Sequence, residues 1–158
     1  MEFEHEAHQQ VHQKVDKYLS ELFEDPYQDP DDGHFYVTYG STVLEISVDA
    51  YGPEEAIVRL VAYCVQGVEV SENLERGLLE TNLDLPVGGF SLIDRDVFLC
   101  YSLFGKSIDN RSLLDAIAGV ATTSDEYDDR IVARFGGKTA MERLRQEEDE
   151  AAAREESD

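Results

Sequence analysis

Positive charge is scarce in this sequence. Lys and Arg number 13 against 35 Asp and Glu, which gives a formal net charge of −22 at pH 7. Binding to nucleic acid requires a basic surface that displaces counterions from phosphates. An anionic membrane surface attracts basic segments in the same way. We therefore expect neither nucleic acid nor a membrane among the partners.

The acidic residues are spread along the whole chain, and only four lysines accompany them. Solvated carboxylates keep a protein soluble in concentrated salt, so the salt-rich cytoplasm of a halophile is one explanation. An ordinary acidic protein is an equally good one, because net charge governs solubility and not fold. Thermal unfolding in low salt and in molar KCl tests the halophile hypothesis, which requires stability to rise with KCl.

Cysteine is scarce too, and long apolar runs are absent. Cys64 and Cys100 each lie in an apolar segment, which is typical of buried free thiols and not of a disulfide framework. No apolar run approaches the ~20 residues of a membrane span. Met1 is followed by acidic and polar residues, so no secretory signal is expected. These features favour one cytoplasmic domain with tails.

Common catalytic motifs are missing as well. The sequence has no Walker loop, dinucleotide-binding glycine pattern, GxSxG turn or CxxC pair. A reactive cysteine needs an activating neighbour, but all four histidines precede residue 35 and both thiols lie in predicted strands. We therefore predict a protein that is not an enzyme and carries no cofactor.

Two segments approach metal-ligand spacing. His8 and His12 lie four residues apart on the first predicted helix, with His5 on the same side, and such a pair can hold zinc. The HExxH pattern is absent and no further ligand is placed, so a polar helix face is the favoured interpretation. Segment 29–33 resembles the start of a calcium loop, but its twelfth position is Gly40 and not a glutamate. A solvated turn is favoured there, and no metal site is predicted.

A cluster of carboxylates comprises Asp125, Glu126, Asp128 and Asp129. Paired carboxylates perform acid–base catalysis when burial separates their pKa values. Nothing in the pattern indicates burial, and only residues 125 and 129 share a helix face. An exposed acidic face, with Arg130 or Arg134 as an ion-pair partner, is the favoured interpretation.

The segment 82–104 is typical of a β-hairpin around which the core is expected to form. A strand over Phe90–Ile93 follows Gly88-Gly89, a tight turn occupies Asp94-Arg95-Asp96, and the return strand covers Val97–Phe104. The return strand is apolar on both faces, with Val97, Leu99, Tyr101 and Leu103 on one and Phe98, Cys100 and Phe104 on the other. Such a strand is buried on both faces, so the rest of the chain must supply two covers.

The remaining elements follow from periodicity and capping residues. They are an amphipathic helix within 1–25 that belongs to the domain, an acidic linker over 26–34, strands over 35–39, 43–50 and 57–66, a short helix from the Ser71 cap to about Asn82, and a helix over 111–135 after the Asp109 cap. Thr122-Thr123-Ser124 weaken the last helix, so a second helix could begin at Ser124. The core is expected over 35–137. The acidic tail, 138–158, is expected to be partly helical and then disordered from about Gln146.

The expected order is helix, three strands, helix, two strands, helix. Short links between consecutive strands favour antiparallel pairing. The predicted fold class is therefore α+β, with the pattern α-β-β-β-α-β-β-α. It is a mainly antiparallel sheet with the long first and last helices packed on one face.

Three stretches carry a resemblance to the YbjN family. They are Thr81-Asn82-Leu83 through Phe90-Ser91-Leu92, Asp125-Glu126-Tyr127-Asp128-Asp129, and Phe135-Gly136-Gly137. The chain resembles that family in a leucine-rich short helix ending in Asn, a Gly-Phe strand start and a final helix ending in Phe-Gly-Gly, over about 35–137. It departs from the family at Ser124, where many relatives carry Ala, and in its acidic tails. The resemblance implies the fold of type III secretion chaperones, a homodimer that binds peptides without catalysis, and the label of sensory transduction regulator.

The first functional hypothesis is a chaperone-like or regulatory module that binds a protein or peptide client. Two long helices can cover one face of a five-stranded sheet, and the second face needs another cover. A client could add as a strand at the sheet edge or place a helix in an apolar groove. Side-chain alternation selects these contact residues: Ile57, Val61, Tyr63, Val65, Phe98 and Phe104.

The second hypothesis is a small ligand-binding or enzymatic domain. Arg59 is the one basic residue within an apolar strand, and it could bind an anionic group. It could instead pair with Glu45 or Asp49 on the neighbouring strand. A third possibility is a domain whose sole role is oligomerisation.

Overall fold

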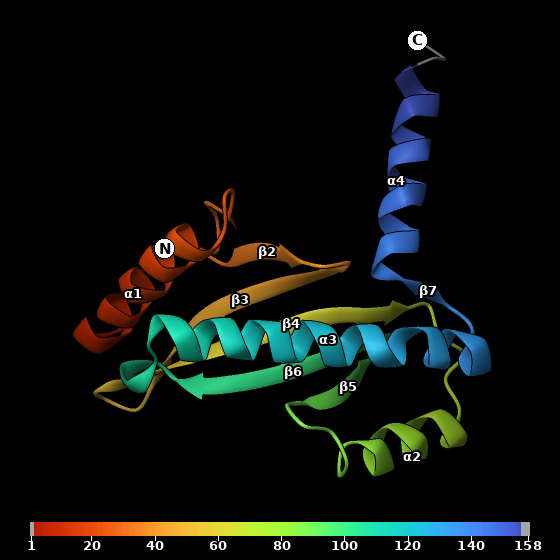
Figure 1. Cartoon of the computed structure of the whole chain (residues 1–158), viewed down its shortest axis with the longest axis horizontal. Helices are drawn as coiled ribbons and strands as arrows, with labels where there is room; N and C mark the ends of the chain where they lie inside the picture. The colour runs from red at the N-terminus through yellow and green to blue at the C-terminus, as the bar shows by residue number, and fades with distance from the viewer. Residues whose placement is uncertain (1, 156–158) are drawn as a thin grey trace.

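Seven antiparallel strands form one sheet in this computed structural model, which describes residues 2–155 (Figure 1). The strand order is β1-β2-β3-β4-β6-β5, and β7 pairs with the end of β4. The elements are α1 (Glu6–Leu22), β1 (Tyr27–Gln28), β2 (Phe35–Tyr39), β3 (Thr42–Tyr51), β4 (Glu55–Gln66), α2 (Glu72–Thr81), β5 (Gly89–Ile93), β6 (Asp96–Phe104), a 3-10 turn (Gly105–Ser107), α3 (Asn110–Phe135), β7 (Lys138–Thr139) and α4 (Ala140–Glu155). The predicted α+β class and element order are confirmed; β1, within the predicted linker, and β7 are added to them, and the predicted helical part of the tail is α4.

The helices begin where capping side chains satisfy the first free backbone N–H groups. The Ser71 hydroxyl accepts a hydrogen bond from the N–H of Leu74 at 3.1 Å. Asp109 and Ser112 form a reciprocal capping box at the start of α3. At the other end of α3, Gly136 adopts a φ of 73°, a conformation that favours glycine. The predicted caps and the predicted stop are therefore confirmed.

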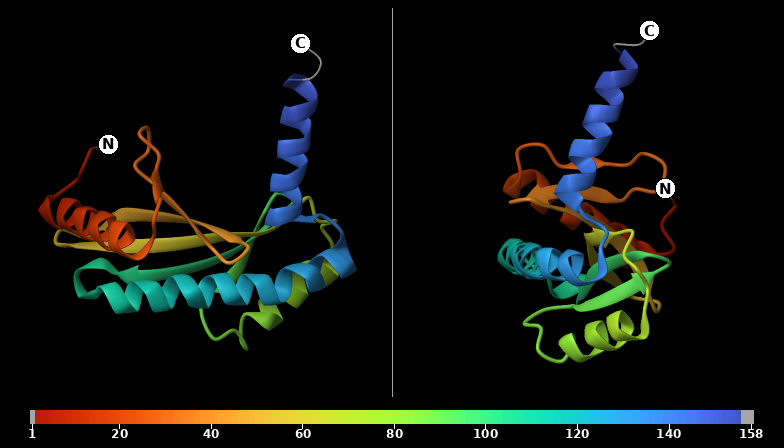
Figure 2. Two further views of the ribbon diagram at one scale, coloured as in Figure 1. Left: turned by 45° about the horizontal axis from the view of Figure 1, so that its top comes forward. Right: turned by 90° about the vertical axis from the view of Figure 1, so that its right-hand side faces the viewer.

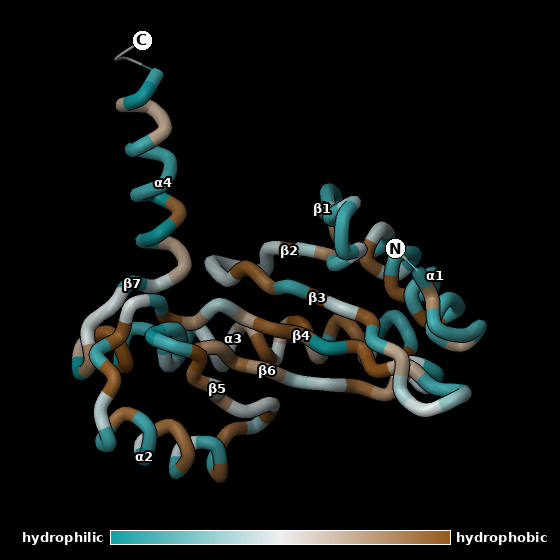
Figure 3. Tube along the Cα trace, turned by 180° about the vertical axis from the view of Figure 1, so that it is seen from behind, coloured by the Kyte–Doolittle hydropathy of each residue, from teal (hydrophilic) through white to brown (hydrophobic). Residues whose placement is uncertain are grey.

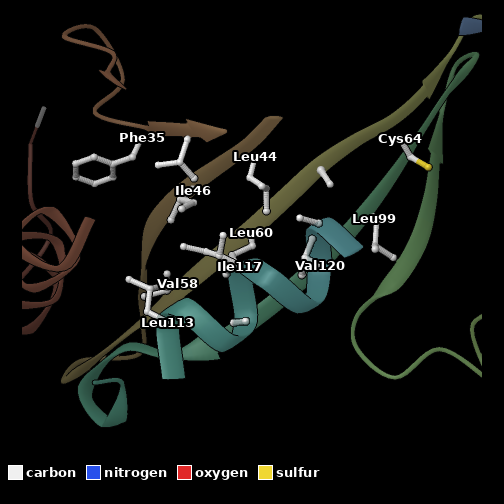
Figure 4. Close-up of a cluster of buried hydrophobic side chains, with 14 of the residues drawn as sticks. Phe35, Leu44, Ile46, Val58, Leu60, Cys64, Leu99, Leu113, Ile117 and Val120 are labelled. Carbon is white, nitrogen blue, oxygen red and sulfur yellow. The ribbon is translucent and has the colours of Figure 1, made fainter. Parts of the chain in front are cut away.

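One face of the sheet is covered by α1 and α3 (Figures 1 and 2). Val11, Val15 and Leu19 of α1 are fully buried. Figure 4 shows buried strand side chains facing those of α3, among them Leu44, Ile46, Leu60, Ile117 and Val120. Removal of this apolar surface from water is the main stabilising term of the fold, roughly 25 cal/mol per Å². The two long helices thus share one face, as predicted.

The helix α3 runs without a break from Asn110 to Phe135. A second helix does not begin at Ser124, because Thr123 and Ser124 are buried and packing outweighs their weak helix propensity. The Cys64 thiol donates a hydrogen bond to the Ser124 carbonyl oxygen at 3.6 Å. Burial raises the pKa of that thiol to about 12. Cys64 is therefore an unreactive core residue at neutral pH.

The tail is helical over a longer stretch than the sequence predicts. The helix α4 continues to Glu155, whereas the expected disorder begins at about Gln146. Its sequence is rich in good helix formers, and Arg143 pairs with Glu147 one turn later at 2.7 Å. None of its residues is buried, and the helix projects away from the sheet (Figure 1). Over residues 2–155, neither α4 nor any other helix has the length and apolar character needed to cross a membrane.

Candidate functional site

The second face of the sheet has no helix lying across it within residues 2–155 (Figure 3). We call it the open face. It is formed by alternate residues of β4 and β6, namely Ile57, Val61, Tyr63, Phe98 and Phe104. Five of the six predicted contact residues therefore share one surface.

The open face is assembled from residue pairs across β4 and β6. Ile57 lies opposite Phe104, and Tyr63 lies opposite Phe98. The rings of Tyr63 and Phe98 meet edge to face with centroids 5.3 Å apart. Phe104 is 56% exposed, and the other four side chains are half-buried. The result is a strip of apolar side chains that a partner can reach, interrupted by the exposed pair of Arg59 and Ser102.

Val65 is separated from this group. The pairing of β4 with β6 shifts between Tyr63 and Val65, and this irregularity interrupts the alternation on which the sequence prediction depends. Val65 is fully buried, and a Cβ placed on Gly137 would lie only 2.9 Å from its Cγ1. The structure therefore assigns Val65 to the core and not to the predicted contact surface.

Arg59 lies on the open face beside a carboxylate. Its Nε is 3.7 Å from Asp49 Oδ2 on β3, which is one of the two ion pairs that the sequence allows. Both side chains are about half exposed, so the pair contributes roughly 0–1 kcal/mol. An anionic ligand at Arg59 would have to displace or share this carboxylate. The geometry therefore favours the ion pair over the anion site.

A polar cluster centred on Glu45 joins the open face at one end. The Glu45 carboxylate accepts hydrogen bonds from the hydroxyls of Tyr36 at 3.2 Å and Tyr63 at 2.7 Å, and it lies 3.0 Å from His34 Nδ1. Burial, reinforced by Glu45, raises the pKa of Tyr36 to about 12 and also raises the pKa of Tyr63. Alternation predicts only that Glu45 faces away from the core. The register of three strands brings its partners together.

The base of α4 lies at the same end of the sheet. Tyr36, Tyr63, Arg143 and Leu144 line a recess of about 250 Å³ between α4 and the strands. Ile57, Val61, Phe98 and Phe104 do not line it. The helix α4 therefore leaves most of the open face accessible.

The histidines of α1 point into the protein. His8 Nε2 lies 2.9 Å from the carbonyl oxygen of Val48, and His12 Nε2 lies 3.2 Å from that of Gly33. Both histidines are buried, which corrects the predicted polar helix face. Their side chains join α1 to β3 and to the loop before β2. Among the described residues, no group of three His, Cys, Asp or Glu is arranged to hold a metal ion.

The segment 29–33 uses its carboxylates on its own backbone. Asp29 Oδ1 accepts a hydrogen bond from the N–H of Asp31, and Asp32 Oδ1 accepts one from the N–H of His34, both at 2.8 Å. Gly33 adopts a φ of 79° where the chain turns. These bonds are typical of Asx turns, which agrees with the predicted turn.

The carboxylates of α3 have separate partners. Asp125 accepts a hydrogen bond from Ser41, and Glu126 pairs with Arg130 at 3.4 Å. Asp128 is half-buried, and burial raises its pKa to about 6. The Asp128 carboxylate also accepts a hydrogen bond from the backbone N–H of Asp129 at 2.6 Å.

The outer edge of β5 is occupied by a side chain. Asn82, just after α2, donates from Nδ2 to the carbonyl oxygen of Phe90 at 3.2 Å. Its Oδ1 accepts from the N–H of Phe90 at 2.6 Å. An unpaired strand edge can bind an added strand, and Asn82 imitates such a strand at this position. Strand addition at β5 would have to displace this amide.

The comparisons with known proteins agree with this architecture. The family model TY-Chap1, described as "T3SS (YopN, CesT) and YbjN peptide-binding chaperone 1", matches residues 9–143. The structure of the HopA1-SchA chaperone-effector complex is similar with a TM-score of 0.57 at 15% identity, covering 74% of this chain and 91% of that chain. The ExsC-ExsE complex is similar with a TM-score of 0.61 at 12% identity, covering 78% of this chain and 94% of that chain. At such identities the likeness concerns the fold alone. A search among curated proteins finds no match.

Proposed function

The chain belongs to the family of T3SS and YbjN peptide-binding chaperones, and on that premise we propose that it is a non-enzymatic module whose open face holds a segment of a client protein. The structural neighbours support a protein client, because one of them is described as a chaperone-effector complex. Holding a client segment would also sequester it, which is the form that a regulatory role would take.

The uncovered apolar strip on the open face carries this proposal. Contiguous exposed apolar side chains on a protein surface mark interaction sites. Val61 and Phe98 are half-buried in the isolated chain, so a partner would complete their removal from water. Aromatic side chains such as Phe98 and Phe104 are the residue type that anchors most protein interfaces.

The client segment would lie across β4 and β6 and not along β5. Its apolar side chains would contact Val61 and Phe98, and its polar groups could meet Arg59 within the strip and the Glu45 cluster at its end. The amide of Asn82 already pairs with Phe90 at the β5 edge. Face binding therefore requires less rearrangement of the chain than strand addition at that edge.

A homodimer is part of the proposal, and it would use a different surface. Leu79 and Leu83, one turn apart at the end of α2, are 72% and 88% exposed. A second copy could bury both leucines without covering the open face. Light scattering coupled to gel filtration should give twice the mass of one chain. The double variant Leu79→Glu/Leu83→Glu should have the mass of a single chain.

Photo-crosslinking from the open face tests the client site. We would replace Phe98 by a benzophenone amino acid in the host cells and identify the crosslinked polypeptide. Tyr39, an exposed aromatic residue at the end of β2, is the matched control position. The proposal expects one recurrent client from position 98 and little or none of it from position 39.

The variant Phe98→Asp separates client binding from stability. It should abolish that crosslinked client, detected from a second probe at Phe104, while the purified variant still melts cooperatively. Equal crosslinking from positions 98 and 39, or an unchanged yield in Phe98→Asp, would remove the open face as the client site.

A further inference from the structure

A second recess lies between α2 and the C-terminal part of α3. Its volume is about 490 Å³, within the range of ~300–1,000 Å³ that is typical of ligand pockets. We call it the α2–α3 groove. Its apolar lining comes from both helices and from β5, and it includes Leu74, Leu78, Phe90, Tyr127 and Ile131. The groove lies on the helix side of the sheet and shares no lining residue with the open face.

Two arginines stand at the rim of this groove. Arg130 lies over the ring of Tyr127, with 5.2 Å from its guanidinium carbon to the ring centroid, and Arg134 lies over Phe135 at the same distance. The side chain of Arg130 also reaches Glu126 at 3.4 Å. Arg134 takes part in none of the ion pairs within residues 2–155. One cation at the rim is thus free to bind an anionic group.

The lining of the groove contains no carboxylate. This is unusual in a chain with 35 acidic residues. Four other recesses on the described surface each include at least one Asp or Glu among their lining residues. The α2–α3 groove therefore combines an apolar floor with two lining arginines and no lining carboxylate, on a strongly negative protein.

Gly77 leaves room in the groove. It lies in the interior of α2, where glycine costs about 1 kcal/mol relative to alanine. A Cβ at this position would meet no atom within 4 Å, so nothing in the isolated chain requires a glycine there. The missing side chain lets an occupant approach the backbone of α2 closely.

We infer that the α2–α3 groove binds a client segment in which apolar and acidic residues are interspersed. The apolar side chains would lie against Leu78 and Ile131 beside Gly77, and a carboxylate would pair with Arg134. An arginine that is stacked on an aromatic ring and has no partner is well placed to form such a charge-assisted hydrogen bond. This inference rests on the proposed peptide-binding function and adds a second, charge-selective contact to it.

The electrostatics of the whole chain make the test decisive. A protein with a formal charge of −22 attracts basic peptides and repels acidic ones at long range. We would compare two short fluorescent peptides that share the same leucines, one with glutamates and the other with lysines between them. Fluorescence anisotropy with the full chain at moderate salt should show tighter binding of the Leu/Glu peptide. A preference for the Leu/Lys peptide, or no binding of the Leu/Glu peptide, would overturn the inference.

Variants locate the binding. Combining Arg130→Gln with Arg134→Gln should weaken binding of the Leu/Glu peptide by about tenfold or more, because the loss of one charge-assisted hydrogen bond costs roughly that factor. Arg111→Gln combined with Arg145→Gln removes the same two charges at exposed arginines outside the groove, so this double variant is the control and should leave binding unchanged. Gly77→Phe should abolish binding by filling the groove, and thermal melting should show that each variant is folded.

The open-face variant distinguishes this inference from the proposed function. If Phe98→Asp abolishes binding of the Leu/Glu peptide and the groove variants do not change it, the groove is not a binding site and the open face remains one. If the groove variants weaken binding of the Leu/Glu peptide and Phe98→Asp does not, the groove is the site that binds the acidic segment. The crosslinking from Phe98 then decides independently whether the open face holds a client.

Discussion

The two faces of β4 differ in their cover although both are apolar. Val58, Leu60 and Ala62 on one face are fully buried beneath the long helices. Val61 and Tyr63 on the other face are half-buried and belong to the accessible strip. The difference shows that an apolar pattern on both faces of a strand does not ensure burial on both, because burial depends on how many elements the chain can place over each face.

Residues 2–155 place no helix across the second face of the sheet. The amphipathic helices α1 and α3 occupy one face, as Figure 2 shows. The short helix α2 buries Leu74 and Leu78 beside β5 and does not lie across the sheet. The charged helix α4 buries none of its residues. In the proposed function, a client segment supplies the cover that these helices leave out.

The largest contrast between closed and open regions should appear in two glycine substitutions. At Gly105, beneath α1, a Cβ would overlap Val11 Cγ1 and lie 2.9 Å from the carbonyl oxygen of Ala56. Gly105→Ala should therefore lower the free energy of unfolding by about 3 kcal/mol. Gly77→Ala, facing the open groove, should raise it by up to about 1 kcal/mol. Urea unfolding measures both, and a stabilising Gly105→Ala would contradict the close packing of α1.

A matched pair of valines should give the next largest contrast. Val58→Thr places a hydroxyl in the covered face and should lower the free energy of unfolding by about 2 kcal/mol. Val61→Thr places the same group on the open face, where water can reach it, and should change the value by less than about 0.5 kcal/mol. Thr has nearly the shape of Val, so neither substitution creates a cavity, and the two losses of unfolding free energy can be compared directly. Equal losses would mean that the open face is buried in solution.

The smallest effect concerns a carboxylate on the covering helix α3, because Asp128 is only half-buried and solvent screens its charge. Burial, together with Asp129, Asp125 and Glu142, raises the pKa of Asp128 from 3.8 to about 6. The folded state therefore binds its proton more tightly than the unfolded state does, so this contribution to stability is present below pH 4 and is lost as the pH rises through 6.

The variant Asp128→Asn tests this pH dependence. It lacks the titrating group, so its stability relative to the natural chain should rise between pH 4 and pH 7 and then stay level. Asp115→Asn, an exposed carboxylate of the same helix, is the control. Parallel stability curves for the natural chain and Asp128→Asn would show that Asp128 is solvated in both states.

Much of the candidate site follows from alternation, and the exceptions have identifiable causes. Ile57, Val61 and Tyr63 occupy the predicted face because β4 is regular up to Tyr63. Val65 does not, because the pairing shifts after Tyr63, and no local pattern in the sequence signals that shift. The Glu45 cluster could not be predicted from local sequence either, since its hydroxyl donors come from two other strands.

The sequence by itself determined the positions of the long elements, their caps and the resemblance to the YbjN family. Those features depend on residues a few positions apart, such as Asp109 with Ser112 or the repeat of leucines along a helix. Only the tertiary structure decided which sheet face is covered, that Val65 is buried and that Arg134 borders an apolar groove. These outcomes depend on contacts between residues far apart in the chain, where register and packing outweigh local preference.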